Sequence, residues 1–257
     1  MRWALAVRRP DGSVYTEAHP GIDRWPRLRR TFLRGVVALV DAVSIGLRAS
    51  TIAMREAIGA RTDGGERVVL GAVGVAAIAI FVVFPALATA RWTGVRGDVA
   101  EASLRAAVLL VYLSGLSRSA TARRLFQYHG AEHKAIAAYE RHGRMPSLED
   151  ARRESPVHVR CGTDFIALFV IACGVVFAFV PREPFWLASI LRVALLPVVM
   201  AVAYETMRAA AAREGSIASR IVTLPGRALQ RITTREPSED QLEIALRALR
   251  MATGGET

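Results

Sequence analysis

Long uncharged runs alternate with basic segments along this chain of 257 residues. Residues 68–90 form a run of 23 without a charged side chain, and residues 165–181 form a run of 17. At about 1.5 Å per residue, a helix over the first run extends about 34 Å, enough to cross the hydrocarbon core of a bilayer. Two further apolar stretches, 99–116 and 185–204, are interrupted by charged residues such as Arg105 and Arg192. The pattern predicts four transmembrane helices over these four stretches.

The segments outside the apolar runs have patterns of their own. Residues 3–9 and 13–18 flank Pro10-Asp11-Gly12, which has turn chemistry, so they predict a β-hairpin. Residues 31–60 predict a helix with one charged stripe, formed by Arg34, Asp41, Arg48 and Arg55 at intervals of seven. Such a helix suits the membrane interface or a polar seam against the bundle. It is also long enough for a fifth crossing, which would place the arginine-rich N-terminus outside.

The C-terminal segment predicts one more amphipathic helix. Ser238 is a good N-cap, with Gln241 three residues later. Leu242, Leu246 and Leu249 then give residues 238–252 one apolar face. This surface is suited to docking a partner in the cytoplasm.

Composition and charge support a membrane protein and orient it. Hydrophobic residues make up 52% of the chain, yet Lys+Arg number 34 against 23 Asp+Glu, for a net charge of +11. Residues 1–67 hold 12 of the basic residues, 117–163 hold nine and 207–257 hold eight. Four crossings would place all three segments on one side, which the positive-inside rule assigns to the cytoplasm. The basic residues flank apolar spans and share no stripe with aromatic residues, which argues against nucleic-acid binding.

These patterns predict a mainly α-helical, polytopic membrane bundle in the inner cell membrane, with both termini in the cytoplasm. We expect three parts. Residues 1–67 form the hairpin and the amphipathic helix. Residues 68–206 form a four-helix membrane domain whose cytoplasmic loop, 119–163, carries polar chemistry. Residues 207–257 form a cytoplasmic tail.

The candidate chemistry centres on His129, Glu132 and His133, which have H-x-x-E-H spacing. Positions i, i+3 and i+4 of a helix share one face, so these three side chains converge. In this arrangement two histidines hold a divalent metal and the glutamate acts as general base. A helix leaving a membrane also carries His and Glu when its face is wet, so a hydrogen-bonded network without metal is an alternative.

Other candidate ligands lie at the same predicted depth. His158 and Cys161 directly precede the third apolar run, and Glu205 ends the fourth. Imidazole and thiolate donors favour Zn²⁺, whereas a shell dominated by carboxylates would suit Fe²⁺ or Mn²⁺. If His129, His133, His158 and Cys161 all bind, the metal is structural; if one position stays open, it is catalytic.

The chain resembles the YqhQ-like family of bacterial membrane proteins, which has no established function and is sometimes described as predicted metal-dependent enzymes. The matching stretches, in order, are Phe126-Gln127-Tyr128-His129-Gly130-Ala131-Glu132-His133-Lys134, Tyr139-Glu140, His158-Val159-Arg160-Cys161-Gly162-Thr163, Leu195-Leu196-Pro197, Tyr204-Glu205 and Thr233-Thr234-Arg235-Glu236-Pro237. The resemblance implies an integral membrane protein with an inward-facing cluster of His, Glu and Cys. Family members usually have a Gly-Gly-Gln-Ala-Val segment ahead of the part that resembles Trp3–Gly12, and tend to have proline where this chain has Val159.

Our leading hypothesis is a membrane protein with a divalent-metal site, Zn²⁺ first, that performs metal-assisted hydrolysis with Glu132 as catalytic base. The main alternative is a non-enzymatic membrane scaffold or assembly factor whose metal is structural. A transporter is a second alternative. The first and third spans are nearly uncharged, which gives this alternative little support. Expected partners are membrane lipids and either a cytoplasmic protein or a second copy of the chain.

Overall fold

The computed structural model describes residues 2–21, 25–58, 66–158, 161–213 and 215–254. In chain order the elements are β1 (Arg2–Arg8), β2 (Val14–Pro20), the short 3-10 helix η1 (Leu28–Arg30), α1 (Arg34–Ile58), α2 (Glu66–Ile78), the π-helical turn η2 (Ala79–Val83), α3 (Phe84–Ala88), α4 (Gly94–Leu116), α5 (Ala120–His142), α6 (Leu148–Arg152), α7 (Gly162–Phe177), α8 (Phe185–Ala212), α9 (Ile217–Thr233) and α10 (Glu239–Thr253). The predicted mainly helical fold with a small N-terminal hairpin is confirmed. Val159, which departs from the family pattern, lies outside the described residues.

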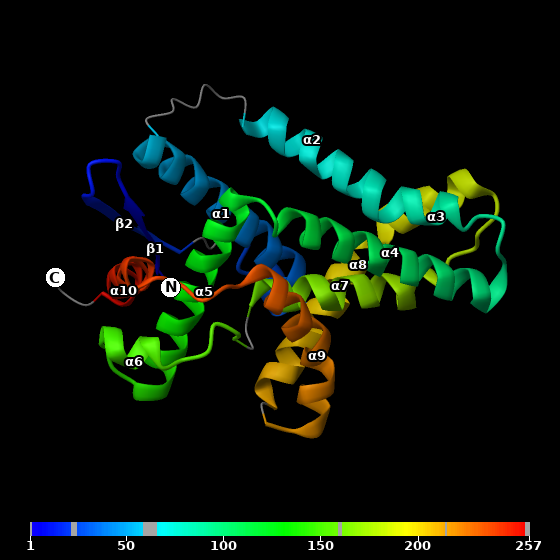
Figure 1. Cartoon of the computed structure of the whole chain (residues 1–257). Helices are drawn as coiled ribbons and strands as arrows, with labels where there is room; N and C mark the ends of the chain where they lie inside the picture. Colours follow the sequence, from blue (N-terminus) through cyan, green and yellow to red (C-terminus); the bar gives the residue numbers. More distant parts are fainter. Residues whose placement is uncertain (1, 22–24, 59–65, 159–160, 214, 255–257) are drawn as a thin grey trace.

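The N-terminal hairpin is antiparallel and runs from the pair Arg2 and Pro20 to the pair Arg8 and Val14. Its turn uses Gly12 at a φ of 85°, a conformation that costs glycine little. Leu5 and Val7 of β1 are buried, and β1 packs against α10. The first and last elements of the chain therefore lie side by side (Figure 1).

Among the residues that the structure describes, four helices are long and apolar enough to cross a membrane, which is compatible with a membrane protein. Their apolar segments are Arg34–Ala57 in α1, Gly71–Ala88 through α2, η2 and α3, Gly94–Leu116 in α4, and Phe185–Ala212 in α8. This set differs from the four predicted helices. It includes α1, and the predicted third span corresponds to α7, a shorter apolar helix of 16 residues.

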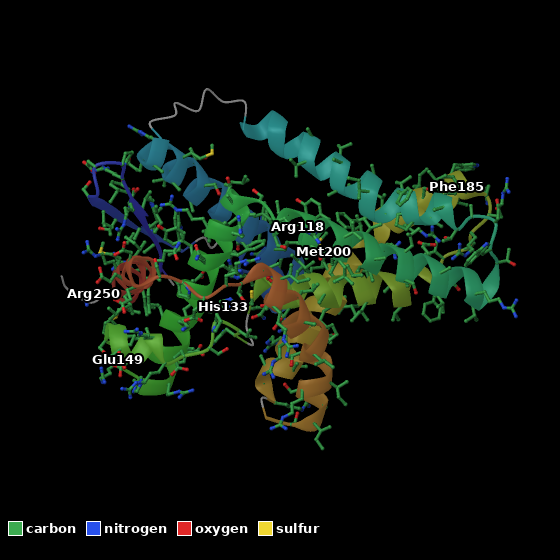
Figure 2. All side chains as sticks on the ribbon, in the orientation of Figure 1. Arg118, His133, Glu149, Phe185, Met200 and Arg250 are labelled. Carbon is green, nitrogen blue, oxygen red and sulfur yellow. The ribbon has the colours of Figure 1, made fainter. Side chains whose placement is uncertain are left out.

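The apolar helices pack into a bundle whose core holds Val82, Leu168, Cys173, Phe177 and Val199. Figure 2 shows mostly carbon along α2 and the middle of α4 and α7, while nitrogen and oxygen gather around α5, α6, α10 and the hairpin. An apolar bundle with a polar layer at one end is the distribution expected of a helical membrane protein.

The charged residues inside the bundle form ion pairs with one another. Glu101 of α4 is 3% exposed, and its carboxylate pairs with Arg105 at 2.8 Å and Arg192 at 3.1 Å. Arg182 approaches the same carboxylate at 3.2 Å. A buried guanidinium needs such partners because desolvation of an unpaired charge is costly. We therefore assign these arginines to packing inside the bundle, where Arg192 joins α8 to α4.

The polar layer consists of α5, α6, α10 and the hairpin, and α9 connects it to the bundle. In Figure 1, α9 lies across the direction of α4 and α7, and it packs on α7 and α8. Gly226 permits this contact, because a Cβ there would lie 2.1 Å from Oδ1 of Asp164 in α7. The sequence analysis did not predict α9.

Candidate metal centre

Two imidazoles and one thiol meet where α5 approaches the start of α7. The ligand atoms of His129, His133 and Cys161 all lie within 4.8 Å of one another. His129 and His133 are one helical turn apart on α5, while Cys161 is the N-cap of α7. Nε2 of His129 lies 3.2 Å from Sγ of Cys161. His133 and Cys161 are buried, and His129 is half-buried, so the group is largely screened from solvent.

Main-chain carbonyls fix the orientation of both rings. Nδ1 of His129 lies 2.8 Å from the carbonyl oxygen of Thr233, and Nδ1 of His133 lies 2.6 Å from that of Pro156. A carbonyl only accepts hydrogen bonds, so each Nδ1 donates and carries the proton of a neutral ring. Each Nε2 then presents a lone pair to a metal when the ring is neutral, and donates to the Cys161 thiolate when the ring is protonated. Such carbonyl partners are the usual second shell of metal-binding histidines.

The surroundings of Cys161 favour its thiolate. Burial raises the pKa of the thiol, but hydrogen bonds with His129, His133 and Thr163 outweigh it and lower the pKa to about 5. The main-chain N–H of Thr163 also donates to Sγ at 3.3 Å, at the N-terminus of α7. Burial lowers the pKa of His129, but its bonds to Cys161 and Thr233 raise it by more, for a net rise. Thiolate and neutral imidazole are the donor forms that bind metals.

His158 lies beside this group but is held by other partners. Its ring centroid is 5.9 Å from that of His133, while its Nε2 lies 3.1 Å from a carboxylate oxygen of Glu140. Gln230 of α9 fixes the main chain of His158 from both sides, accepting from its N–H at 2.9 Å and donating to its carbonyl at 2.8 Å. The structure therefore places His158 next to the three donors without bringing its Nε2 among them.

Glu205, predicted as a ligand, is also engaged elsewhere. Its carboxylate forms a two-pronged ion pair with Arg34 of α1 and lies 3.7 Å from Arg208. This pair ties the start of α1 to α8.

Glu132 is exposed and lies on a different flank of α5 from the two imidazoles. It lines a cavity of about 320 Å³ between α5, the hairpin and α10, which Leu5 and Ile244 also line. Adjacent positions on a helix are about 100° apart, so the side chain of Glu132 can point away from that of His133. The structure brings His129, His133 and Cys161 together and leaves Glu132 outside that group.

Several residues that orient the site were not predicted. Thr233 and Pro156 contribute through their carbonyls, which any residue type has, so their identities carry no signal. Gln230 is fully buried and bonds both to His158 and to Asp164 of α7, at 2.7 Å. The one sequence signal for these residues is the stretch Thr233-Thr234-Arg235-Glu236-Pro237, which matches the family pattern but does not indicate a role. It supplies the carbonyl of Thr233 and the carboxylate of Glu236, which pairs with the buried ammonium of Lys134.

An apolar groove of about 550 Å³ reaches the cluster from the side of α1. Its lining residues are Gly35, Ala38, Leu39 and Ala42 of α1, His129 of α5, Cys161 through Thr163, Phe165 and Ile166 of α7, and Tyr204 and Met207 of α8. The groove therefore connects two of the three donor side chains to the apolar surface between helices.

Comparisons with known proteins identify the family. The family model described as "Protein of unknown function (DUF1385)" matches residues 31–254, so the chain belongs to that family. The chain is also 37% identical over 147 residues to "Uncharacterized protein YqhQ" of Bacillus subtilis (strain 168). That match covers 57% of this chain and 46% of the relative, so it spans less than half of the relative's length. No solved structure matches.

Proposed function

We propose that this member of the DUF1385 family is a multi-pass protein of the inner cell membrane that binds a divalent cation, Zn²⁺ first, at its cytoplasmic face. His129, His133 and Cys161 are the proposed ligands. Two imidazole nitrogens and a thiolate form a donor set that suits Zn²⁺ better than the harder cations. The basic segments at both termini and around residues 117–163 support the cytoplasmic assignment.

The observation that carries this proposal is the convergence of three donors while the other predicted ligands have partners of their own. His158 is bonded to Glu140, and Glu205 is bonded to Arg34. Three protein ligands leave one tetrahedral position for water or substrate, the usual pattern of catalytic zinc. We therefore propose metal-assisted hydrolysis as the reaction class.

A cation held by His129, His133 and Cys161 would act as a Lewis acid and would lower the pKa of water bound to it. The carbonyls of Thr233 and Pro156 hold the imidazoles, and the burial of Cys161 limits competing solvent. Glu132 is the proposed general base. To act as base, its side chain turns from the hairpin cavity toward the imidazoles.

The apolar groove beside His129 and Cys161 supports a substrate with a hydrocarbon portion. A volume of about 550 Å³ falls within the range of small-molecule pockets. We propose that an amphiphilic substrate enters between α1 and α7 and presents its polar part to the metal centre.

A structural metal in a membrane scaffold is the second candidate. His158 favours it, because its ring centroid lies 5.9 Å from that of His133. If His158 exchanged its bond to Glu140 for a bond to the metal, it would be the fourth protein ligand and would complete the coordination shell. The polar layer of α5, α6, α10 and the hairpin would then be the part that the metal stabilises and that a cytoplasmic partner contacts.

Metal analysis of the purified full-length protein tests the site. We expect about one zinc per chain, and at least a tenfold loss of bound metal in His133→Ala and Cys161→Ala. His142→Ala is the matched control, because His142 lies at the far end of α5 beside Asp150 and should leave the metal in place. No stoichiometric metal in the parent protein, or full retention in His133→Ala, would contradict the proposal.

Glu132→Gln separates the two candidates. If the protein is an enzyme, this variant keeps its metal and loses its function in cells. As a scaffold, it keeps both, while His129→Ala lowers the abundance of the protein.

A further inference from the structure

A second cavity, on the opposite flank of α5 from the imidazoles, is lined by four arginines. It measures about 580 Å³ and lies between β1, the start of α5 and the start of α10. Its lining residues are Arg8, Ala120, Arg123, Arg124, Gln127, Tyr128, Arg235, Ser238, Asp240 and Gln241. Three separate segments thus contribute guanidinium groups to one concave surface.

The charges in this basic cavity do not cancel. Its single carboxylate, Asp240, pairs with Arg8 at 3.2 Å. Arg235 makes only a 3.4 Å contact with the carbonyl of Ser117, which carries no full charge. Within the described part of the chain, Arg123 and Arg124 form no ion pair. Three guanidinium groups without a carboxylate in one cavity create a strong positive potential, which an anion would neutralise.

The scaffold of the cavity is fixed independently of any ligand. The N–H of Arg235 donates to the carbonyl of Phe126 at 2.9 Å. A Cβ on Gly130 would lie 2.1 Å from the carbonyl oxygen of Arg235, so the two segments are in close contact. Ser119, the N-cap of α5, makes no side-chain cap bond, and Ala120, the first residue of α5, lines the cavity, so the positive end of the helix dipole lies beside it.

The cavity lies at the end of an apolar helix. Arg235 contacts Ser117, the residue directly after α4. The last turns of α4 expose Tyr112 and Leu116. If α4 crosses the membrane, the cavity lies at the level of the phosphate groups of the adjacent leaflet, where basic pockets bind anionic headgroups. Guanidinium groups match phosphate oxygens with paired, charge-assisted hydrogen bonds.

We infer that this basic cavity binds a phosphate group, and that its source is the headgroup of an anionic phospholipid in the cytoplasmic leaflet. A soluble phosphate ester has the same recognition chemistry, and the experiment below distinguishes the two. The inference does not depend on the metal centre, which lies on the other flank of α5 and uses none of the cavity's side chains.

The test uses the full-length protein in nanodiscs, with lipid retention measured by native mass spectrometry. Phosphatidic acid and phosphatidylglycerol are offered against phosphatidylcholine, and inorganic phosphate and pyrophosphate are added as competitors. We expect selective retention of the anionic lipids and a loss of about tenfold or more in Arg124→Gln and Arg123→Gln, as for a lost charge-assisted bond. Both residues are exposed, so the substitutions should leave folding intact.

Arg153→Gln is the matched control. It removes the same charge directly after α6, where Arg153 is exposed and pairs with Glu149 at 3.0 Å, away from the cavity. Displacement of the lipid by millimolar phosphate or pyrophosphate would assign the site to a soluble phosphate ester. Equal losses in Arg153→Gln and Arg124→Gln, or unchanged binding in Arg124→Gln, would overturn the inference.

Discussion

At the scale of single residues, Cys161 is the group whose chemistry depends most on its surroundings. Four groups contact its sulfur: the two imidazoles of α5, and the hydroxyl and the main-chain N–H of Thr163. Each of them stabilises the thiolate relative to the thiol. In Cys173, by contrast, the sulfur lies in the apolar core of the bundle with 0% exposure, where a thiol packs as a small hydrophobic group.

Removal of metal should therefore expose a thiol that reacts at unusually low pH. We expect the alkylation rate of Cys161 in chelator-treated protein to fall only below about pH 5, where the thiolate is protonated, and to be nearly constant above it. Mass spectrometry of the Cys161 peptide against pH measures this directly, with a free model thiol as the control. His129→Ala removes a bond to the thiolate and should raise the inflection. Added Zn²⁺ should protect the residue, and an inflection above pH 8 in the parent protein would contradict the assignment.

Spacing along one helix was sufficient to find His129 and His133, because the period of an α-helix fixes which positions share a face. Cys161 could be found because it directly precedes an apolar run. The partners of His158 and Glu205 could not be found, because Glu140 and Arg34 reach them through tertiary contacts. A polar residue at the right depth can serve an ion pair as readily as a metal.

At the scale of elements, α9 contributes to the site although its sequence pattern does not predict it. Its apolar residues divide between two faces. Leu229 is buried against the bundle, while Ile217, Ile221 and Leu224 are exposed at positions i, i+4 and i+7. Pro225 and three arginines interrupt any long apolar run. Such a segment is typical of a helix in the membrane interface, and it predicts neither a span nor a soluble helix.

The contact of α9 with α7 should be essential to the metal centre. In Gly226→Ala, the new Cβ would lie 2.1 Å from Oδ1 and 2.6 Å from Cα of Asp164, so α9 must move away from α7. We expect a loss of about 1–3 kcal/mol in stability from overpacking. We also expect weaker zinc binding, because Thr233 and Gln230 move with α9.

Thermal unfolding in detergent and zinc titration measure both effects. Gly115→Ala in α4 is the control, since its Cβ would meet nothing within 4 Å and alanine favours the helix. If Gly226→Ala lowered stability as expected while zinc affinity stayed at the parent value, α9 would contribute to folding but not to the metal centre.

At the scale of the whole molecule, three contacts restrict which helices can cross the membrane. The hairpin packs on α10, α10 packs on α5, and Arg9 of the hairpin pairs with Glu56 near the end of α1 at 2.6 Å. If the bundle spans a membrane, the hairpin, α5 and α10 therefore lie on the same side of it. That requires an even number of crossings between the hairpin and α5, and again between α5 and α10.

The pair of Arg9 with Glu56 also holds the end of α1 on the side of the hairpin, so the two conditions leave one assignment in which the remaining apolar helices cross. In that assignment α2–α3 and α4 would cross between the hairpin and α5, and α7 and α8 would cross between α5 and α10. A crossing by α1 would add a third to the first interval, although α1 is long and apolar enough. At 16 residues α7 is about 24 Å long, short of a typical hydrocarbon core. Much of its surface is buried in the bundle, which reduces its exposure to lipid.

Cysteine accessibility in intact cells can test this topology. In a background without Cys161 and Cys173, single cysteines replace Ser13 in the hairpin turn, Ser147 before α6 and Thr93 before α4, all of which are exposed positions. We expect an impermeant maleimide to label the Thr93 position in intact cells and the other two only after permeabilisation, because the basic segments remain inside. A cysteine at Thr253, at the end of α10, serves as an internal control and should behave like Ser13. Labelling at Ser13 in intact cells together with protection at Ser147 would mean that α1 crosses. That result would be incompatible with the packing of the hairpin on α10 in the polar layer.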